Sequence, residues 1–255
     1  MNKLHPVSEA EVIAGFLRNE FFHPEYDRDR TRFESLVANP DLKDAQQNAL
    51  RRALLFRRRG HMWRELPADT QWWRVEVGVE DVPKLRIFAR AHWISIAGGD
   101  FRAENVVQRI RSHSYPKRVE SFVAKIRSIG ESRPRQTEAG PVLLIAIDGS
   151  SPLVVLEGNH RVTAALLESC QSLASLDFYC GLSPRMAECC WYRTNLPSLS
   201  RYLINRLRNV YDREADVERL LRATGAPPAP SAPGSTNDVG GSPWKADPQL
   251  SRARR

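Results

Sequence analysis

Apolar residues near the start of the chain recur at helical spacing. Val12, Phe16 and Leu17 lie on one side of such a helix, and Ser8 with Glu11 forms a capping box before it. The hydroxyl of a capping serine accepts a hydrogen bond from a backbone N–H that the helix itself leaves unsatisfied. A helix is therefore predicted to begin directly after Ser8.

A second helix is predicted over residues 41–59. Asn39 is placed to cap its start, and Gly60 is placed to end it. Between the two helices, residues 23–32 are polar and predict a loop. The first part of the chain, residues 1–70, is therefore expected to be a helical segment that covers one side of whatever follows.

The hydrophobic period changes to two at about residue 71. Trp73, Val75 and Val77 alternate with more polar neighbours, which predicts a strand. Residues 141–147 form a continuous apolar run, as expected for a strand that is buried on both faces. Further strands are predicted over 153–156 and 176–180, with a β candidate over 87–96; helices are predicted over 106–110, 116–130 and 160–169.

These alternating elements predict one α/β (α+β) domain over residues 71–195, with a mixed sheet and packed helices. Two closing helices are expected within 196–224, the second capped by Asp212. Residues 225–255 are rich in Pro, Gly, Ser and Ala and end in a small basic cluster. Such a segment buries too little apolar surface to offset its ordering entropy, so disorder is predicted there.

Composition places the chain among globular proteins, with 42% hydrophobic and 27% charged residues. No apolar run approaches the roughly 20 residues that span a bilayer, and the first residues lack the apolar core of a secretory signal. A cytoplasmic protein without a membrane partner is expected. The cysteines show no CxxC or zinc-ligand spacing and are expected to be reduced and mostly buried; they are Cys170, Cys180, Cys189 and Cys190.

A net charge of +8 leaves two interpretations open. The basic helix 41–59, which ends in Arg57, Arg58 and Arg59, and the arginine-rich tail would contact phosphates in a nucleic-acid-binding or regulatory protein. Alternatively, these arginines lie on solvated helix faces, where cations suit a helix C-terminus. No aromatic-interleaved RNA motif accompanies the charge.

The segment 153–168 carries the most specific chemistry. An apolar strand ends at Glu157, Gly158 permits a tight turn, and Asn159 is placed to cap the following helix. The first turn of a helix presents free N–H groups and partial positive charge, which favour a phosphate. Arg161 would add a permanent charge, and His160 is able to change its charge near neutral pH. The alternative is that this segment is an ordinary strand-to-helix turn with a capped helix, and that it binds no ligand.

The string VVLEGNHRVTAALL, at 154–167, resembles the signature turn of the ParB/sulfiredoxin-like superfamily, in which an apolar strand meets an acidic-Gly-x-basic-Arg turn and an alanine-rich helix. The order of the elements over residues 72–195 also resembles that superfamily. The resemblance implies a nucleoside di- or triphosphate (ATP, ADP or CTP) with Mg²⁺. Its phosphates would be held by Gly158, Asn159, His160, Arg161 and Thr163.

The resemblance also implies catalytic roles, and individual residues of this sequence exclude some of the activities found in the superfamily. Asn159 stands where sulfiredoxin chemistry needs a cysteine, so sulfiredoxin activity is not expected. Partition proteins follow this domain with a multi-helix DNA-reading module and a dimerisation region. Here two predicted helices and a tail follow it, so a role in chromosome partition is not expected. The kinase-like members use a carboxylate base, for which Glu76 is the candidate and Asp81 the next. Glu157 is the candidate metal ligand and, with His160, a candidate catalytic group.

The leading hypothesis is therefore a nucleotide-binding protein that transfers a phosphoryl group to a small molecule or hydrolyses the nucleotide. The rival is a non-catalytic nucleic-acid-binding or regulatory protein that uses the helix 41–59 and the tail. A third hypothesis is a degenerate domain that serves only as a scaffold for other proteins. The sequence leaves the oligomeric state open.

Overall fold

The computed structural model describes residues 1–21, 23–131, 140–211 and 217–223. Six strands form one mixed sheet in the order β1-β2-β6-β4-β5-β3. The strands are β1 (Asn2–Val7), β2 (Gln71–Glu76), β3 (Leu85–Ile87), β4 (Val142–Ala146), β5 (Leu153–Glu157) and β6 (Phe178–Leu182). The pairs β4–β6 and β3–β5 are parallel, and the other neighbours are antiparallel. This arrangement confirms the predicted α+β class.

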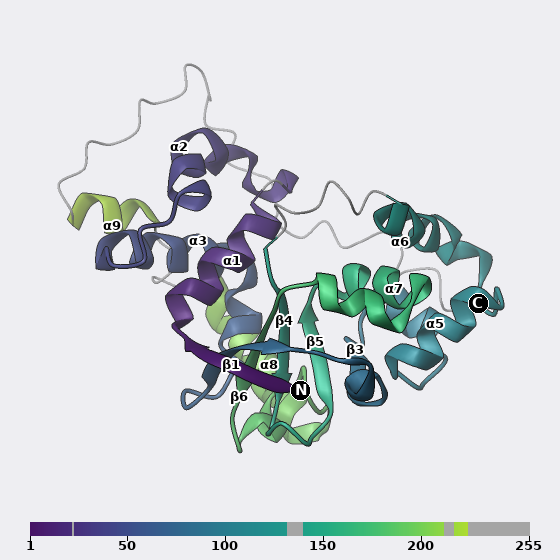
Figure 1. Cartoon of the computed structure of the whole chain (residues 1–255). Coiled ribbons are helices and arrows are strands. Elements are labelled where there is room, and N and C mark those ends of the chain that lie inside the picture. Colours follow the sequence, from purple (N-terminus) through teal and green to yellow (C-terminus); the bar gives the residue numbers. More distant parts are fainter. Residues whose placement is uncertain (22, 132–139, 212–216, 224–255) are drawn as a thin grey trace, which may run out of the picture.

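Helices cover both faces of the sheet (Figure 1). The α-helices are α1 (Glu9–Glu20), α2 (Asp27–Ala38), α3 (Ala45–Trp63), α4 (Ala91–Ala97), α5 (Ala103–Arg111), α6 (Glu120–Glu131), α7 (Asn159–Glu168), α8 (Leu196–Val210) and α9 (Val217–Ala223). One face carries α4 to α7, and the other carries α1, α2, α3 and α9. The N-terminal segment therefore covers one side of the domain, as expected.

The central strands are apolar throughout because each contributes to two cores. Along β4, Val142 and Leu144 face the α4–α7 layer, whereas Leu143 and Ile145 face the α1–α3 layer. Successive side chains of a strand point to opposite faces, so both sets are buried. This observation confirms the strand that the continuous apolar run predicted.

The first strand, β1, was not predicted. It lies at the sheet edge and pairs antiparallel with β2, from Asn2 opposite Glu76 to Val7 opposite Trp72. Nearly all of its side chains are exposed, so its sequence carries no hydrophobic alternation. Residues 1–70 are consequently not wholly helical, and the sheet begins before the predicted domain boundary.

The prediction for residues 23–32 was also wrong. A short 3₁₀ turn, Pro24–Tyr26, leads into α2 within the stretch that was expected to be a loop. Buried Tyr26, Phe33 and Val37 anchor this segment in the core. Within residues 23–32, Tyr26 is the only large hydrophobic side chain, so that stretch carries no periodic signal of its own.

The second helix begins and ends later than predicted. Asp44, rather than Asn39, caps α3 by accepting hydrogen bonds from the N–H groups of Gln46 and Gln47, at 2.8 and 3.0 Å. The helix then passes through Gly60, which is buried within it, and ends at Trp63. Glycine ends a helix when its backbone turns left-handed, and Gly60 stays helical here.

Other boundaries differ by smaller amounts. The β candidate over 87–96 divides into β3 and the helix α4, and α6 continues through Gly130 to Glu131. The four cysteines are free thiols, of which three are buried and Cys170 is half-buried. The predicted cap Asp212 and the tail from residue 224, for which disorder was predicted, lie outside the described residues.

Candidate functional site

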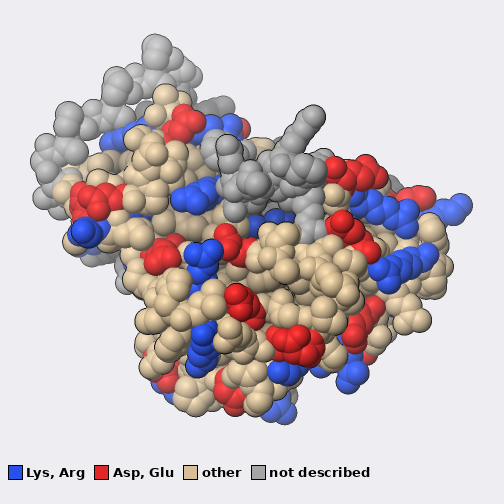
Figure 2. Space-filling view, in the orientation of Figure 1, with Lys and Arg blue, Asp and Glu red and all other residues tan. Residues whose placement is uncertain are grey.

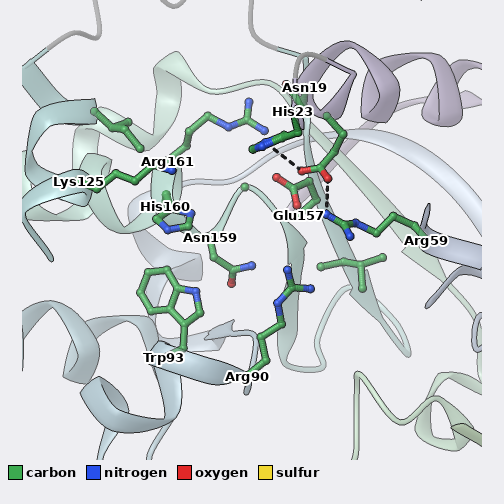
Figure 3. A pocket seen from close by; sticks show the side chains of 14 residues that line it. Asn19, His23, Arg59, Arg90, Trp93, Lys125, Glu157, Asn159, His160 and Arg161 are labelled. Carbon is green, nitrogen blue, oxygen red and sulfur yellow. Dashed lines mark hydrogen bonds and ion pairs between the residues drawn. The ribbon is translucent and has the colours of Figure 1, made fainter. Parts of the chain in front are cut away.

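A cavity of about 440 Å³ lies beside the junction of β5 and α7. It receives side chains from both helical layers: α1 and α3 on one side, and α4, α6 and α7 on the other (Figure 3). Its lining residues are Asn19, Glu20, His23, Arg59, Arg90, Trp93, Lys125, Ile129, Leu156, Glu157, Gly158, Asn159, His160 and Arg161. The predicted residues Glu157, Gly158, Asn159, His160 and Arg161 all line this cavity.

Gly158 makes the sharp turn from strand to helix. Its φ is +94°, a left-handed conformation that L side chains rarely adopt, and a Cβ there would lie 2.9 Å from Cγ2 of Val142. The first intrahelical hydrogen bond runs from the N–H of Val162 to the carbonyl of Gly158, at 3.0 Å. The N–H groups of residues 159–161 precede that bond and form the positive end of the helix at the cavity.

Asn159 does not cap α7, contrary to the prediction. Gly158 occupies the capping position without a side chain, and Asn159 is the first helical residue. The Oδ1 atom of Asn159 instead accepts a hydrogen bond from the backbone N–H of Phe88, at 2.9 Å. That bond holds the segment after β3 against the start of α7. The helix N–H groups consequently stay available to an anion.

Arg161 holds the start of β4. Its guanidinium donates hydrogen bonds to the carbonyl oxygens of Gly140 and, at 3.3 Å, Pro141. Burial lowers the pKa of Arg161, while Glu157 and Glu20 act in the opposite direction. The side chain therefore has a structural role in addition to the predicted contact with phosphate.

Glu157 shares the lining of the cavity with a second carboxylate, Glu20. Burial raises the pKa of Glu157, and the charge of Glu20 raises it further. Glu20 is itself held by Arg59, at 2.5 Å, and lies 3.8 Å from the ring of His23 (Figure 3). A carboxyl with a raised pKa accepts and releases a proton closer to neutral pH than an ordinary glutamate.

His160 lies against two aromatic rings. Its ring centroid is 5.4 Å from that of Trp93 and 4.8 Å from that of Phe122. Burial, together with the nearby charges of Lys125 and Arg90, lowers its pKa to about 4. His160 is therefore neutral at pH 7, and its buried Nε2 atom has no hydrogen-bond partner among the described residues.

Two cations of the cavity have no ion pair or side-chain hydrogen bond within the part of the chain that the structure describes. Arg90 points into the cavity from below in Figure 3, and its guanidinium carbon lies 5.5 Å from the centroid of the Phe88 ring. Lys125 enters from α6. Both are exposed, so they are able to reach a ligand without breaking an ion pair within the described residues.

Glu76 and Thr163 are not part of this cavity. Glu76 ends β2, which is separated from β5 by β6 and β4, a distance of about 14 Å at the usual strand spacing. Its carboxylate accepts a hydrogen bond from Asn2 instead, at 3.0 Å. Asp81, the next candidate base, is buried and binds the amino group of Met1 and Lys84. Thr163 is fully buried within α7.

Sequence reasoning missed the contribution of α1 and α3. Glu20 follows Phe16 by four residues, so helical spacing places it on the same buried side of α1. That position was a usable signal, because a carboxylate on an apolar stripe needs a partner. Arg59, Arg90 and Lys125 carried no such signal, since each meets the site only through the tertiary fold.

The arginines of α3 are engaged within the protein. Arg57 binds Asp29 at 2.5 Å, Arg52 binds Glu9 at 2.8 Å, and Arg59 binds Glu20. Figure 2 shows acidic and basic side chains interspersed over the face of the molecule in view. The basic helix therefore offers less charge to a nucleic acid than its sequence suggests.

Magnesium fits this cavity only as an ion that enters with phosphates. Within the described residues, no group of three or more His, Cys, Asp and Glu side chains could hold a metal. Glu157 and Glu20 supply two carboxylates, and Mg²⁺ commonly takes one or two together with phosphate oxygens and water. Glu157 therefore suits the predicted role in metal binding only when a phosphate ligand is present.

Comparison with known proteins adds no identification. Neither a protein-family model, nor a curated protein, nor a solved structure matches the chain. The resemblance to the ParB/sulfiredoxin-like superfamily consequently stays a prediction from the turn at residues 157–161. No helix in the described residues combines the length and apolar character that crossing a bilayer requires.

Proposed function

We propose that the cavity at the start of α7 binds the phosphates of a nucleoside di- or triphosphate, in a cytoplasmic protein that transfers a phosphoryl group to a small molecule or hydrolyses the nucleotide. The observation that carries this proposal is that a helix N-terminus shares the cavity with two cations, Arg90 and Lys125, for which the described part of the chain supplies no ion pair. Cations and helix N–H groups that converge on one cavity favour an anion.

The size and lining of the cavity agree with a nucleotide. Its volume of about 440 Å³ falls within the range of small-molecule sites. The ring of Trp93, which is buried and lies beside His160, supplies an apolar wall next to the cations. An apolar wall beside a charged end suits a ligand that combines a ring system with phosphates.

In the proposed reaction, Arg90, Lys125 and the N–H groups of α7 stabilise the charge that develops on the phosphate. Glu157 is the group that holds or moves a proton at its carboxylate, because burial and Glu20 raise its pKa. When Mg²⁺ enters with the phosphates, Glu157 would hold it as a carboxylate in place of carrying a proton, and the ion would supply further neutralisation of phosphate charge. Glu76 has no role in this mechanism, since it lies at a distant strand.

Thermal unfolding with added ligands tests the proposal. ATP, ADP, CTP and GTP, each with and without Mg²⁺, are compared with inorganic pyrophosphate. A ligand at ~100 times its dissociation constant adds about 2.7 kcal/mol to stability, which appears as a rise in Tm. We expect at least one nucleotide to raise Tm. If none of the compounds raises Tm, the proposed function is wrong.

The variant that accompanies this experiment is Arg90→Gln/Lys125→Gln. Arg161→Ala is less informative, because its loss also frees the carbonyls of Gly140 and Pro141. The double variant removes two exposed charges and none of the ion pairs that the described residues form, so its own Tm should stay close to that of the wild type. We expect it to lose most of the nucleotide-dependent shift.

A further inference from the structure

The helix α8 presents an unusually apolar surface to solvent. Its exposed hydrophobic side chains, with the exposed fraction of each, are Leu196 (83%), Leu199 (40%), Leu203 (53%), Ile204 (51%), Leu207 (65%) and Tyr211 (85%), the last directly after the helix. At 100° per residue, these positions share an arc of about 140° on the helix surface. Contiguous exposed apolar surface of this kind marks an interaction site.

The opposite side of α8 is fixed to the protein. Ser198 donates a hydrogen bond to the carbonyl of Arg193 at 2.8 Å, and Asn205 donates one to Glu65 at 2.7 Å. The ring of Tyr202 contacts that of Trp191, with centroids 5.0 Å apart. The apolar arc therefore faces outward on an anchored helix. Figure 1 places α8 at the lower end of the sheet, away from α6 and α7.

Arginines border the apolar arc on both sides. On the helix surface, Arg206 lies next to one edge of the arc, and Arg201 and Arg208 lie next to the other. The helix Leu196–Val210 contains no Asp or Glu. Arg201 binds Glu188 at 3.0 Å, outside the helix. An apolar strip with positively charged side chains at both edges is the pattern of a helix that lies in the headgroup region of an anionic membrane.

We propose that α8 docks this protein onto the surface of a membrane that contains anionic lipids. The leucines would enter the boundary between headgroups and acyl chains, and the arginines would contact lipid phosphates. The charge argues against a second copy of the chain, because two paired α8 helices would bring arginines together and neither helix contains a carboxylate to face them. A membrane-docked helix is distinct from a spanning one, so the short apolar runs of the sequence do not oppose it.

Vesicle flotation with the full chain tests this proposal. One set of vesicles contains phosphatidylcholine alone, and the other also contains phosphatidylglycerol. We expect the protein to float with the anionic vesicles only and to be released by high salt, which screens the charges. Equal binding to both sets, or binding to neither, would overturn the proposal.

Two variants separate the apolar and the charged contributions. Leu203→Ser/Leu207→Ser should lower the partition coefficient by on the order of tenfold or more, because both leucines leave water on docking. Arg206→Gln/Arg208→Gln should lower it by roughly 25-fold, since each arginine near an anionic surface contributes about fivefold. Both pairs are exposed, so the denaturation midpoints should stay unchanged.

Leu4→Ser is the matched control, because Leu4 is 45% exposed on the edge strand β1, outside α8. It should float as the wild type does. Unchanged flotation of the α8 variants would assign binding to another surface and overturn the proposal. The protein could instead form a dimer in the absence of lipid, and Leu203→Ser/Leu207→Ser could convert that dimer to a monomer. This result would overturn the proposal, because it would assign the apolar arc to contact with a second copy of the chain. Nucleotide binding plays no part in these outcomes.

Discussion

Two basic regions of this protein, the helix α3 and the cavity at the start of α7, use their cations in different ways. In α3, Arg57 and Arg52 bind carboxylates of α2 and α1, and Arg51 is fully buried. In the cavity, Arg90 and Lys125 have no ion pair within the described residues. The cluster that looks most basic in the sequence therefore serves the fold, and the more dispersed cations are available to a ligand.

The largest expected effect is at Arg51. Its guanidinium donates to the carbonyls of Leu36 and Asp41, at 3.1 and 2.7 Å, and to the side chain of Asn48, at 2.5 Å. Arg51→Met would remove the buried guanidinium and leave these partly buried acceptors without their donor, at a cost of about 3 kcal/mol in the free energy of unfolding. Urea denaturation measures this loss.

The exposed Lys43 provides the control for that experiment. Lys43→Gln removes one cation from the same region and should change stability by less than about 0.5 kcal/mol. Similar midpoints for Arg51→Met and the wild type would contradict the structural role assigned to α3, and would restore its arginines as candidates for a nucleic-acid contact.

The next effect is at Gly158, where the cavity depends on backbone geometry. Gly158→Ala places a Cβ 2.9 Å from Val142 at a φ of +94°, and should lower stability by about 2 kcal/mol. Gly99 has a similar φ of +99° but nothing within 4 Å of an added Cβ. Gly99→Ala should therefore lower the free energy of unfolding only by the cost of the left-handed backbone conformation, about 1 kcal/mol. Equal losses in urea denaturation would show that the contact with Val142 is unimportant.

The smallest effect concerns pH. Burial and nearby cations lower the pKa of His61 and His160 to about 4. The unfolded chain then binds more protons than the folded protein between pH 6.5 and 4, so stability falls as pH decreases through that window. Because both rings are partly exposed, we expect a loss of about 1 kcal/mol for each at pH 5.

Urea midpoints at several pH values, in the wild type and in His160→Gln, measure this dependence. The variant lacks one titrating group, so its stability should fall less between pH 7 and 5. Parallel curves for the two proteins would mean that His160 is not held neutral by its place between Trp93 and Lys125.

Much of the fold followed from the hydrophobic pattern, because buried strands and amphipathic helices repeat their apolar residues regularly. The run at β4 and the turn at Gly158 are examples, and both lie where they were predicted. The edge strand β1 escaped prediction because it has no buried face. The start of α3 was misplaced because Asp44 competes with Asn39 as a cap, and only tertiary packing decides between them.

The candidate site was predictable only in part, for a similar reason. The turn from Glu157 to Arg161 is local, so its chemistry is visible in the sequence. Arg59, Arg90 and Lys125 come from three separate helices or loops, and no local pattern relates them to α7. Glu76 was proposed from its residue type alone, and the strand order places it at a distance.

The most direct test of the account is a calorimetric titration with the nucleotide that raises Tm most. It compares the wild type with Arg90→Gln/Lys125→Gln and with Lys117→Gln, a control that removes an exposed lysine outside the cavity. We predict that Kd rises at least about tenfold in the double variant, because two charged contacts to phosphate are lost, and stays unchanged in the control. Equal affinities in all three proteins would contradict the assignment of the phosphate site to the start of α7.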